Sequence, residues 1–255
     1  MEEPERDSLE SPSCIFCRET SGGFESEEHM FPESLIGDAA VLPRGYVCDR
    51  CNHGRLGDVD KFLINFGPFA LGRVVFGPLT KKGKFPRAEI GDLIIEKTRP
   101  GHVELRRRDG SAPFQKLERC ADGEWQVEFS AGGKPNWRRV ARGIAKIALE
   151  FVAFHKGHEY ACHPDFDAAR RFILEGAAHR SYLCVRTRGA KMKQGASVAG
   201  WAGELIEIVI FGVHTWVSLR EAETTPLVDE AQLLEHGIMA VPLWEELPAV
   251  GAVEA

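Results

Sequence analysis

The most regular alternation of apolar and polar residues in the chain lies between Asn136 and His155. Apolar side chains recur there every three or four positions, which is the spacing that places them on one face of an α-helix. Asn136 precedes the pattern and belongs to a residue type that caps helices through its side chain. The residues predicted to line the apolar face are Val140, Ile144, Ile147, Ala148, Phe151 and Val152.

Two shorter helices are predicted on either side of this one. The first covers residues 58–66, with Asp58 as its N-cap and Gly67-Pro68 as its end. Its apolar residues share one helical face, at positions 59, 62, 63 and 66. The second covers residues 165–175 and ends at Gly176, because glycine is the usual residue just beyond a helix C-terminus.

Strand-like segments account for much of the remaining chain, separated by turn signals such as Asp109-Gly110. The longest apolar run, residues 205–219, is expected to form a hairpin that turns near Gly212, whereas residues 195–203 are small and polar enough for a mobile loop. The other predicted strands are Ala88–Lys97, Val103–Arg107, Phe114–Leu117, Trp125–Phe129 and Tyr182–Thr187. Helices and strands in this order predict an α+β fold.

Composition narrows the class of protein. The chain has 255 residues and a net charge of −6, so a generally basic protein that coats nucleic acid is not expected, although a local basic face remains compatible with that charge. No apolar run reaches the ~18–20 residues that span a bilayer, and the acidic first residues lack the features of a signal peptide. We therefore expect a cytoplasmic chain without membrane contact.

Four cysteines form two Cys-x-x-Cys turns, which we call the first and second knuckles. The knuckles are separated by 30 residues and are Cys14 with Cys17, and Cys48 with Cys51. Such a pair of turns is typical of structural zinc, with four thiolates at the corners of a tetrahedron and no open position for chemistry. One zinc ion per chain is therefore predicted. The remaining cysteines have no close cysteine neighbour and are expected to be inert: Cys120, Cys162 and Cys184.

The residues in and between the knuckles carry a resemblance to a known family. In order they are Cys14-Ile15-Phe16-Cys17, Glu28-His29-Met30-Phe31-Pro32-Glu33-Ser34-Leu35-Ile36-Gly37, Val47-Cys48-Asp49-Arg50-Cys51-Asn52 and Leu56-Gly57-Asp58-Val59-Asp60. This order resembles the HNH endonucleases, in the branch whose ββα-metal site is braced by four zinc-binding cysteines. The resemblance covers residues 14–66. It implies a zinc-stapled ββα-metal module followed by a larger α+β region.

The resemblance also implies a chemistry. An HNH enzyme hydrolyses DNA phosphodiester bonds with a histidine as general base and a divalent cation, Mg²⁺ or Mn²⁺, as Lewis acid. By position, His29 would be the base, and Glu28 and Asn52 would supply the sparse oxygen set that Mg²⁺ accepts. His53 is a rival ligand for the cation. DNA is the expected partner, and we expect a homodimer if the module makes double-strand breaks.

One departure from the family pattern leaves alternatives open. Pro43 stands where the family has a middle asparagine that steadies the histidine, so either another group orients His29 or the site is weakened. Arg44 beside it can contact phosphate instead. A zinc-ribbon nucleic-acid-binding module without catalytic activity is therefore the alternative to an endonuclease. A redox or metal sensor that uses the knuckles themselves is a third reading.

Basic clusters downstream supply candidate contacts to phosphate. One cluster consists of three arginines on the polar side of the main predicted helix. Another lies at the end of a predicted strand and just beyond it. The predicted nucleic-acid-binding residues are Arg44, Arg138, Arg139, Arg142, Arg186, Arg188, Lys191 and Lys193, whereas Lys81-Lys82-Lys84 and Arg106-Arg107-Arg108 are as well explained by a solvated face. We expect a disordered leader over 1–13, the module over 14–66, and a region over 67–255 that serves DNA binding, dimerisation or regulation.

Overall fold

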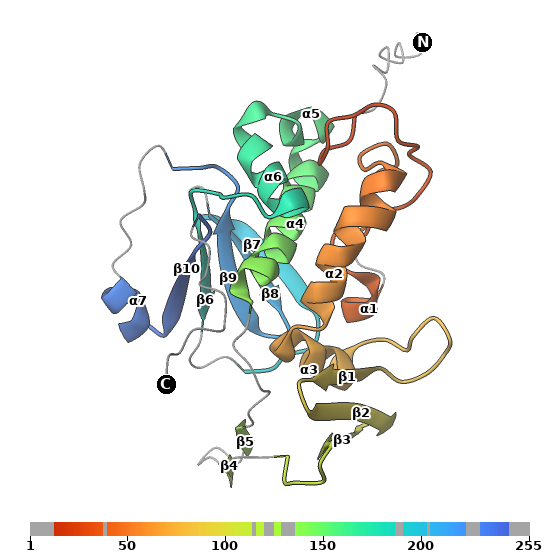
Figure 1. The fold of residues 1–255 in the computed structure, drawn as a ribbon, viewed down its shortest axis with the longest axis vertical. Coiled ribbons are helices and arrows are strands. Elements are labelled where there is room, and N and C mark those ends of the chain that lie inside the picture. Colours follow the sequence, from red (N-terminus) through yellow and green to blue (C-terminus); the bar gives the residue numbers. More distant parts are fainter. Residues whose placement is uncertain are drawn as a thin grey trace, which may run out of the picture.

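The computed structural model describes residues 13–37, 40–113, 116–119, 125–128, 136–186, 191–202, 205–222 and 230–244 (Figure 1). Its helices are α1 (Glu33–Ile36), the π-helical turn η1 (Cys51–Leu56), α2 (Gly57–Ile64), α3 (Gly67–Phe76), α4 (Trp137–Lys156), α5 (His158–Ala161), the 3-10 turn η2 (Pro164–Phe166), α6 (Asp167–Glu175) and α7 (Glu230–Glu235). The fold is mixed α+β, as the sequence predicts.

Strands of the described chain form three antiparallel sheets. A five-stranded sheet has the order β10-β6-β9-β8-β7, a three-stranded sheet the order β1-β2-β3, and β4 pairs with β5 alone. The strands are β1 (Arg87–Ile90), β2 (Leu93–Arg99), β3 (His102–Arg107), β4 (Lys116–Arg119), β5 (Trp125–Glu128), β6 (Tyr182–Arg186), β7 (Ala196–Ala202), β8 (Leu205–Ile210), β9 (Val213–Ser218) and β10 (Ile238–Pro242).

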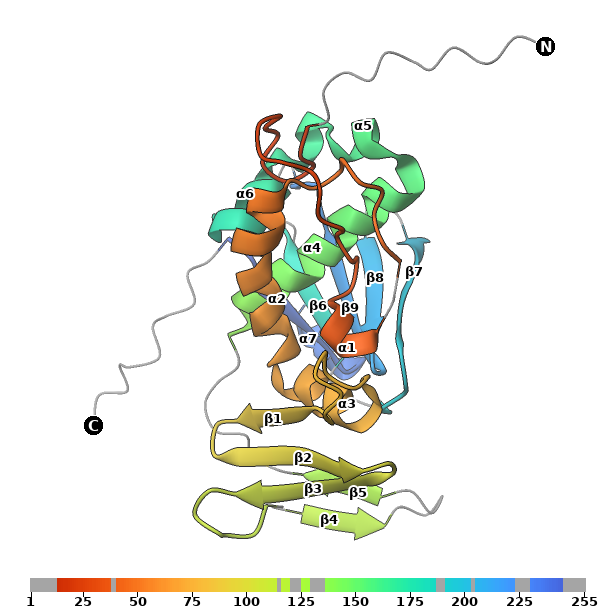
Figure 2. The ribbon, with the colours of Figure 1, turned by 90° about the vertical axis from the view of Figure 1, so that its right-hand side faces the viewer.

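Helix α4 is the centre of the main core. It lies across one face of the five-stranded sheet and has α2 and α6 on its other side (Figures 1 and 2). Because it is covered from both sides, its residues 140–153, apart from the half-buried Arg142, are buried all round the helix rather than along one stripe. Core-facing residues of the sheet alternate with outward ones, as in β8, where Ile206, Ile208 and Ile210 are buried.

Several predicted elements are confirmed. Asn136 caps α4 by accepting a hydrogen bond from the backbone nitrogen of Arg139 at 3.1 Å. Gly176 follows α6 in the left-handed conformation, with φ of 74°. The long apolar run forms the hairpin β8–β9, and Gly212 lies in its turn with φ of 84°. These are positions where a single side chain or backbone angle determines the local structure.

Other predictions are wrong in detail. Helix α2 begins at Gly57 as a continuation of η1, so Asp58 lies in its first turn and does not cap it. Gly67-Pro68 opens a further helix, α3, because proline is tolerated in a first turn, where its missing N–H would lack a partner anyway. The loop expected over 195–203 contains strand β7, which pairing with β8 stabilises despite its small side chains.

The predicted strand Ala88–Lys97 is divided by a turn at Gly91, where φ is 61°, into β1 and β2. Of the predicted leader over 1–13, residues 1–12 lie outside the described residues, as do Phe114, Cys120, Phe129, Thr187 and Arg188. Within the described chain, none of the helices combines the length and the apolar character needed to cross a membrane.

Candidate functional site

The four knuckle cysteines come together in space. Their sulfur atoms all lie within 4.8 Å of one another, and the sulfurs of Cys17 and Cys48 are 3.7 Å apart. That separation is far longer than a disulfide bond. A tetrahedral zinc ion with Zn–S bonds of about 2.3 Å requires sulfur–sulfur edges of ~3.8 Å. The geometry therefore fits a structural zinc ion, and the four-cysteine group predicted from the sequence is one that could hold this metal.

The four sulfurs differ in their affinity for protons. The thiol of Cys51, followed by backbone N–H groups, lowers the pKa of Cys14 to about 5, so this sulfur readily becomes a thiolate. Burial raises the pKa of Cys48 to about 11. For Cys51 the hydrogen bond to Cys14, followed by burial, raises the pKa as well. Adjacent thiolates repel one another in the absence of metal, and a divalent cation would remove that repulsion.

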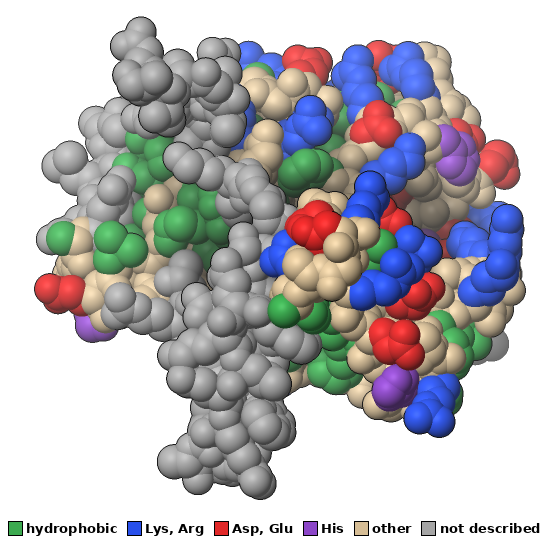
Figure 3. Space-filling model, turned by 60° about the horizontal axis from the view of Figure 1, so that its bottom comes forward, with side chains coloured by type: hydrophobic (Ala, Val, Ile, Leu, Met, Phe, Trp, Pro, Cys, Tyr) green, Lys and Arg blue, Asp and Glu red, His purple; other side chains and the backbone are tan. Residues whose placement is uncertain are grey.

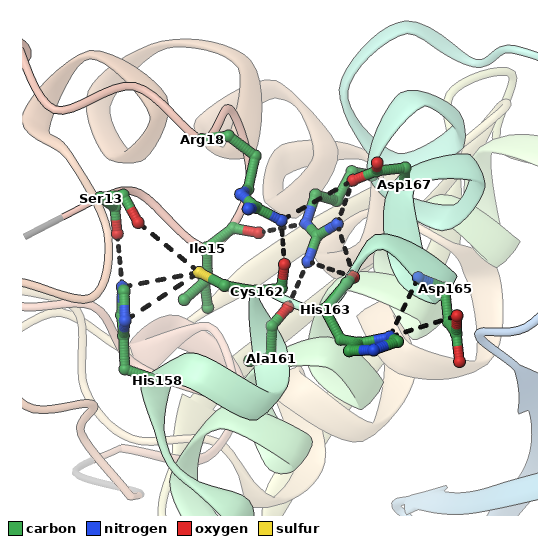
Figure 4. Close-up of polar contacts among 10 residues, drawn as sticks. Ser13, Ile15, Arg18, His158, Ala161, Cys162, His163, Asp165 and Asp167 are labelled. Carbon is green, nitrogen blue, oxygen red and sulfur yellow. Dashed lines mark hydrogen bonds and ion pairs between the residues drawn. The ribbon is translucent and has the colours of Figure 1, made fainter.

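The first knuckle is clamped by α5, α6 and the turn that joins them (Figure 4). The buried guanidinium of Arg170 donates to the carbonyl of Ile15 at 2.7 Å and also to the carbonyls of Ala161 and His163. In return, Arg18, which follows the first knuckle, donates to the carbonyl of Cys162 after α5. A loop of small size cannot bury much of its own surface, so these contacts attach it to the larger core.

His158 and Cys162 complete this clamp. The Nε2 atom of His158 lies 2.5 Å from the carbonyl oxygen of Ser13, and the sulfur of Cys162 is 3.6 Å from the same nitrogen. The ring of Tyr46 meets that imidazole edge-on at 5.2 Å. The imidazole of His163 caps the following turn by accepting a hydrogen bond from the backbone nitrogen of Asp165 at 3.3 Å.

Between the knuckles, two short segments pair as antiparallel strands. The backbone nitrogen of Met30 donates to Ala40 at 2.9 Å, that of Leu42 donates to Glu28 at 2.9 Å, and His29 faces Val41. The helix formed by η1 and α2 follows the second knuckle directly. A β pair followed by a helix is thus present over residues 28–64. The helix starts with π geometry, which is rare and occurs often at functional sites.

Asn52 ties this helix to the β pair. Its side-chain nitrogen donates to the carbonyl of Glu27 at 2.9 Å and to the hydroxyl of Ser26 at 3.2 Å. Both bonds use the amide nitrogen, so the amide oxygen is left for another donor or a cation. The structure therefore places Asn52 against the residue that immediately precedes Glu28 and His29.

Asp49, which sequence reasoning overlooked, braces the same loop. Its carboxylate accepts from the backbone nitrogen of Ser26 at 2.8 Å, from the Ser26 hydroxyl at 2.5 Å and from the nitrogen of Glu25 at 3.3 Å. The bonds from Ser26 lower the pKa of Asp49. His53, the rival cation ligand, is exposed beside this carboxylate. An aspartate inside a Cys-x-x-Cys turn is a sequence signal that could have indicated this role.

Glu28 lies in an unexpected environment. Its carboxylate is 2.6 Å from the ammonium of Lys146 in α4, and its side chain is only 6% exposed. The same ammonium, which is fully buried, lies 3.2 Å from Asp60 and 3.3 Å from Glu150. We call Lys146, Glu28, Asp60 and Glu150 the buried charge cluster. It connects the β pair, α2 and α4 through one cation.

The buried charge cluster holds three carboxylates around one ammonium, and its proton affinities reflect this. Burial raises the pKa of Glu150 well above its usual range and raises that of Asp60 as well. Burial alone would lower the pKa of Lys146, but attraction to the three carboxylates outweighs it and raises that pKa. Sequence reasoning missed Lys146 and Glu150, although their i,i+4 spacing in an otherwise apolar stretch was a usable signal.

His29 is half-buried, whereas its neighbours Glu28 and Met30 are buried. This is the alternation of a strand, so the imidazole leaves the β pair on the side away from the buried charge cluster. Its Nδ1 atom is buried and has no hydrogen-bond partner among the described residues. Pro43 lies in the turn before the second knuckle and accepts a hydrogen bond from the nitrogen of Tyr46 at 3.3 Å.

The predicted phosphate contacts fall into two groups. Arg138 and Arg142 donate to the last carbonyls of α6, at 2.7 Å to Gly176 and 2.9 Å to Ile173, and so stabilise that helix end. Arg139 lies over the ring of Phe62 at 5.4 Å. Arg55, Lys61, Arg139 and Arg142 nevertheless share a hollow of about 550 Å³ beside α2. Arg44 is exposed and pairs with Glu27 at 3.3 Å.

The remaining basic clusters differ in character. Arg106, Arg107 and Arg108 pair with Glu96, Asp92 and Glu89, and Lys81 pairs with Glu33 at 3.0 Å. Figure 3, viewed from the end that carries β1–β3, shows blue and red side chains interspersed over this surface. That mixture is typical of a solvated face. Arg186, Lys191 and Lys193, in contrast, line one cavity on the five-stranded sheet.

Comparison with known proteins found no match to this chain: no family model, no curated protein and no solved structure.

Proposed function

We propose that this chain is a metal-dependent endonuclease of the HNH type that hydrolyses DNA phosphodiester bonds. The observation that carries the proposal is the bond from Asn52 to the carbonyl of Glu27 at 2.9 Å. It joins the start of the helix after the second knuckle to the strand that bears Glu28 and His29. The β pair, the helix and the four-cysteine group that fits zinc lie in the order expected of a zinc-braced ββα-metal site.

In this proposal the imidazole of His29 accepts a proton from a water molecule, and the water oxygen attacks phosphorus. The bond between phosphorus and the leaving oxygen breaks, and a second proton neutralises that oxygen. An imidazole accepts protons near neutral pH. The half-buried position of His29, on the side of the strand away from the buried charge cluster, leaves it open to a substrate.

Asn52 and Glu28 would hold the Mg²⁺ or Mn²⁺ ion, which supplies Lewis acidity and neutralises charge on the phosphate. The amide oxygen of Asn52 fits this role, because the hydrogen bonds of that side chain use its nitrogen. The carboxylate of Glu28 fits less freely, since it lies on the side of the strand opposite His29 and the ammonium of Lys146 is already 2.6 Å from one of its oxygens. A single cation with several water ligands requires only one or two protein oxygens.

That contact of Glu28 also favours a second candidate function. If Lys146 holds the carboxylate permanently, the chain would be a zinc-braced module that binds nucleic acid without cleaving it. Pro43 in place of the family's middle asparagine points in the same direction. The two functions differ in one measurable property, which is cleavage in the presence of a divalent cation.

The test is a nicking assay on supercoiled plasmid with Mg²⁺, Mn²⁺ or EDTA. We expect cleavage by the wild-type chain with either cation, no cleavage in EDTA, and loss of at least a hundredfold in rate for His29→Ala with unchanged zinc content. His102→Ala, an exposed histidine on β3, is the matched control and should cleave normally. A wild-type protein that binds DNA but leaves the plasmid intact at every cation concentration would establish the second candidate instead.

A further inference from the structure

A basic cavity lies on the face of the five-stranded sheet opposite α4. Its volume is about 590 Å³, and its cationic lining residues are Arg186 at the end of β6, and Lys191 and Lys193 before β7. All three side chains are exposed. The whole chain carries a net charge of −6, so three cations against one carboxylate among the described residues that line this cavity are a local concentration of positive charge.

The backbone fixes this segment beside the β8–β9 hairpin. The nitrogen of Lys193 donates to Phe211 at 3.0 Å, and the nitrogen of Phe211 donates to Gly195 at 2.9 Å. A side chain at Gly212 would place its Cβ 1.9 Å from the carbonyl oxygen of Lys191, so only glycine permits this approach. Lys191 and Lys193 both line the cavity beside this hairpin.

Aromatic rings border the cations. The guanidinium of Arg186 lies over the ring of Trp216 at 5.9 Å, and the imidazole of His214 stacks on that ring at 6.0 Å with an interplanar angle of 29°. His214 also lies 2.8 Å from the carboxylate of Glu207 in the cavity lining, which reduces the repulsion that this group would exert on an anion. Trp216 and His214 alternate with the buried Thr215 and Val217, so they face outward.

Cations beside outward-facing rings are the combination that binds single-stranded nucleic acid, because phosphates contact the cations while unpaired bases stack on the rings. We infer that this cavity binds a single-stranded segment of nucleic acid, with Arg186, Lys191 and Lys193 on the phosphates and Trp216 and His214 beside a base. The inference rests on the proposed function only in taking nucleic acid as the ligand, since none of the residues of the cavity belongs to the candidate nuclease site.

The test is equilibrium binding of the zinc-loaded protein to a fluorescein-labelled 20-nucleotide oligo-dT, measured by fluorescence anisotropy in buffer without Mg²⁺, Mn²⁺ or chelator, so that the structural zinc stays bound. We expect the double variant Arg186→Ala/Lys193→Ala to weaken binding at least tenfold. The slope of log affinity against log salt should fall by ~1.4, because about 0.7 is lost per single-strand phosphate contact. Trp216→Leu should weaken binding about tenfold with little change in that slope.

The matched control is Lys156→Ala/Arg171→Ala, which removes two exposed cations from α4 and α6 and should alter binding less than twofold. The inference would be overturned if the control and the cavity variant lost equal affinity for oligo-dT, or if the cavity variant kept wild-type affinity. It would also be overturned if a 20-base-pair duplex bound as tightly as oligo-dT and Trp216→Leu had no effect. Plasmid cleavage is measured separately, so a protein that nicks DNA without this cavity, or binds through it without nicking, distinguishes the two proposals.

Discussion

The ammonium of Lys146 lies 2.6 Å from the carboxylate of Glu28, although 117 residues separate them in the chain, and neither side chain is exposed by more than 6%. The contact joins the central helix to the β pair between the knuckles. A buried ion pair of this kind contributes little net stability compared with apolar residues, but removal of one partner leaves an uncompensated charge. The candidate site and the main core therefore depend on each other through one cation.

Lys146→Met should lower the free energy of unfolding by about 3–5 kcal/mol, because the buried Glu28 and Glu150 and the partly buried Asp60 lose their shared cation. Chemical denaturation followed by circular dichroism measures this directly. Lys156→Met, at the exposed end of the same helix, is the control and should change stability by less than ~0.5 kcal/mol. A Lys146→Met protein as stable as the wild type would show that the buried charge cluster does not exist in solution.

Cys48→Ser should abolish stoichiometric zinc binding and unfold the segment between the knuckles, since the binding energy of a structural zinc ion is also folding energy. Metal analysis of the purified protein should give one zinc ion per chain for the wild type and less than about a tenth of that for the variant. Cys184→Ser, on β6 in the five-stranded sheet, should keep its zinc. Full zinc content after Cys48→Ser would show that the metal is held elsewhere.

The elements that could be predicted from the sequence are those set by residues that act on their neighbours in the chain. Asn136 and Gly176 act on their own neighbours in the chain, so the ends of α4 and α6 followed from residue type alone. The knuckle spacing likewise implied the four-cysteine group. Strand β7 could not be found in this way, because its small residues form a strand only through pairing with β8. Helix α3 was missed because Gly67-Pro68 is compatible with either a helix end or a helix start.

The candidate site likewise combines features that the sequence implied with features that depend on packing. The resemblance to HNH endonucleases implied that Glu28, His29 and Asn52 share a site, which stays a prediction; in the structure Asn52 is bonded to Glu27, the residue before Glu28. No pattern indicated that Glu28 is held by Lys146, since their contact depends on how α4 packs against the knuckle segment. Arg138 and Arg142 were predicted to contact phosphate, but in the structure they donate to carbonyls at the end of α6, which sequence spacing could not reveal.

Arg170→Met should destabilise the attachment of the first knuckle, because its guanidinium makes hydrogen bonds to three backbone carbonyls while buried. We expect a loss of about 3 kcal/mol in unfolding free energy, as for hydrogen bonds to a charged group, and faster release of zinc to a chromogenic chelator. Arg171→Met, the exposed neighbour, should release zinc at the wild-type rate. Identical release rates for the two variants would argue against the clamp.

His179 should make stability depend on pH. Its ring is fully buried against Phe172, its Nε2 lies 2.9 Å from the carbonyl of Ser218, and burial lowers its pKa. Below about pH 6.5 the unfolded chain takes up a proton that the folded chain resists, so this group contributes stability at neutral pH and loses it as pH falls. His179→Gln keeps a donor for the carbonyl of Ser218. The unfolding free energy of the variant should therefore fall less steeply with decreasing pH, by up to ~1.4 kcal/mol per pH unit.

Denaturation of the wild type and His179→Gln between pH 5 and pH 7.5 isolates this contribution, because every other titrating group is common to both proteins. The difference in unfolding free energy should shift in favour of the variant as pH falls. A difference that is constant across this range would mean that His179 takes up its proton equally in the folded and unfolded chains.

Two helical glycines offer opposite outcomes for the same substitution. A Cβ at Gly72 in α3 would lie 2.1 Å from the ring of Phe211 in the β8–β9 turn, whereas a Cβ at Gly54 in η1 meets nothing within 4 Å. Alanine is favoured over glycine inside helices by about 1 kcal/mol, so Gly54→Ala should leave stability unchanged or raise it. Gly72→Ala should instead lower the melting temperature by an amount equivalent to about 1–3 kcal/mol, since the clash requires a shift of the helix or the ring. If both variants were stabilised, α3 would not pack against the sheet as closely as the structure places it.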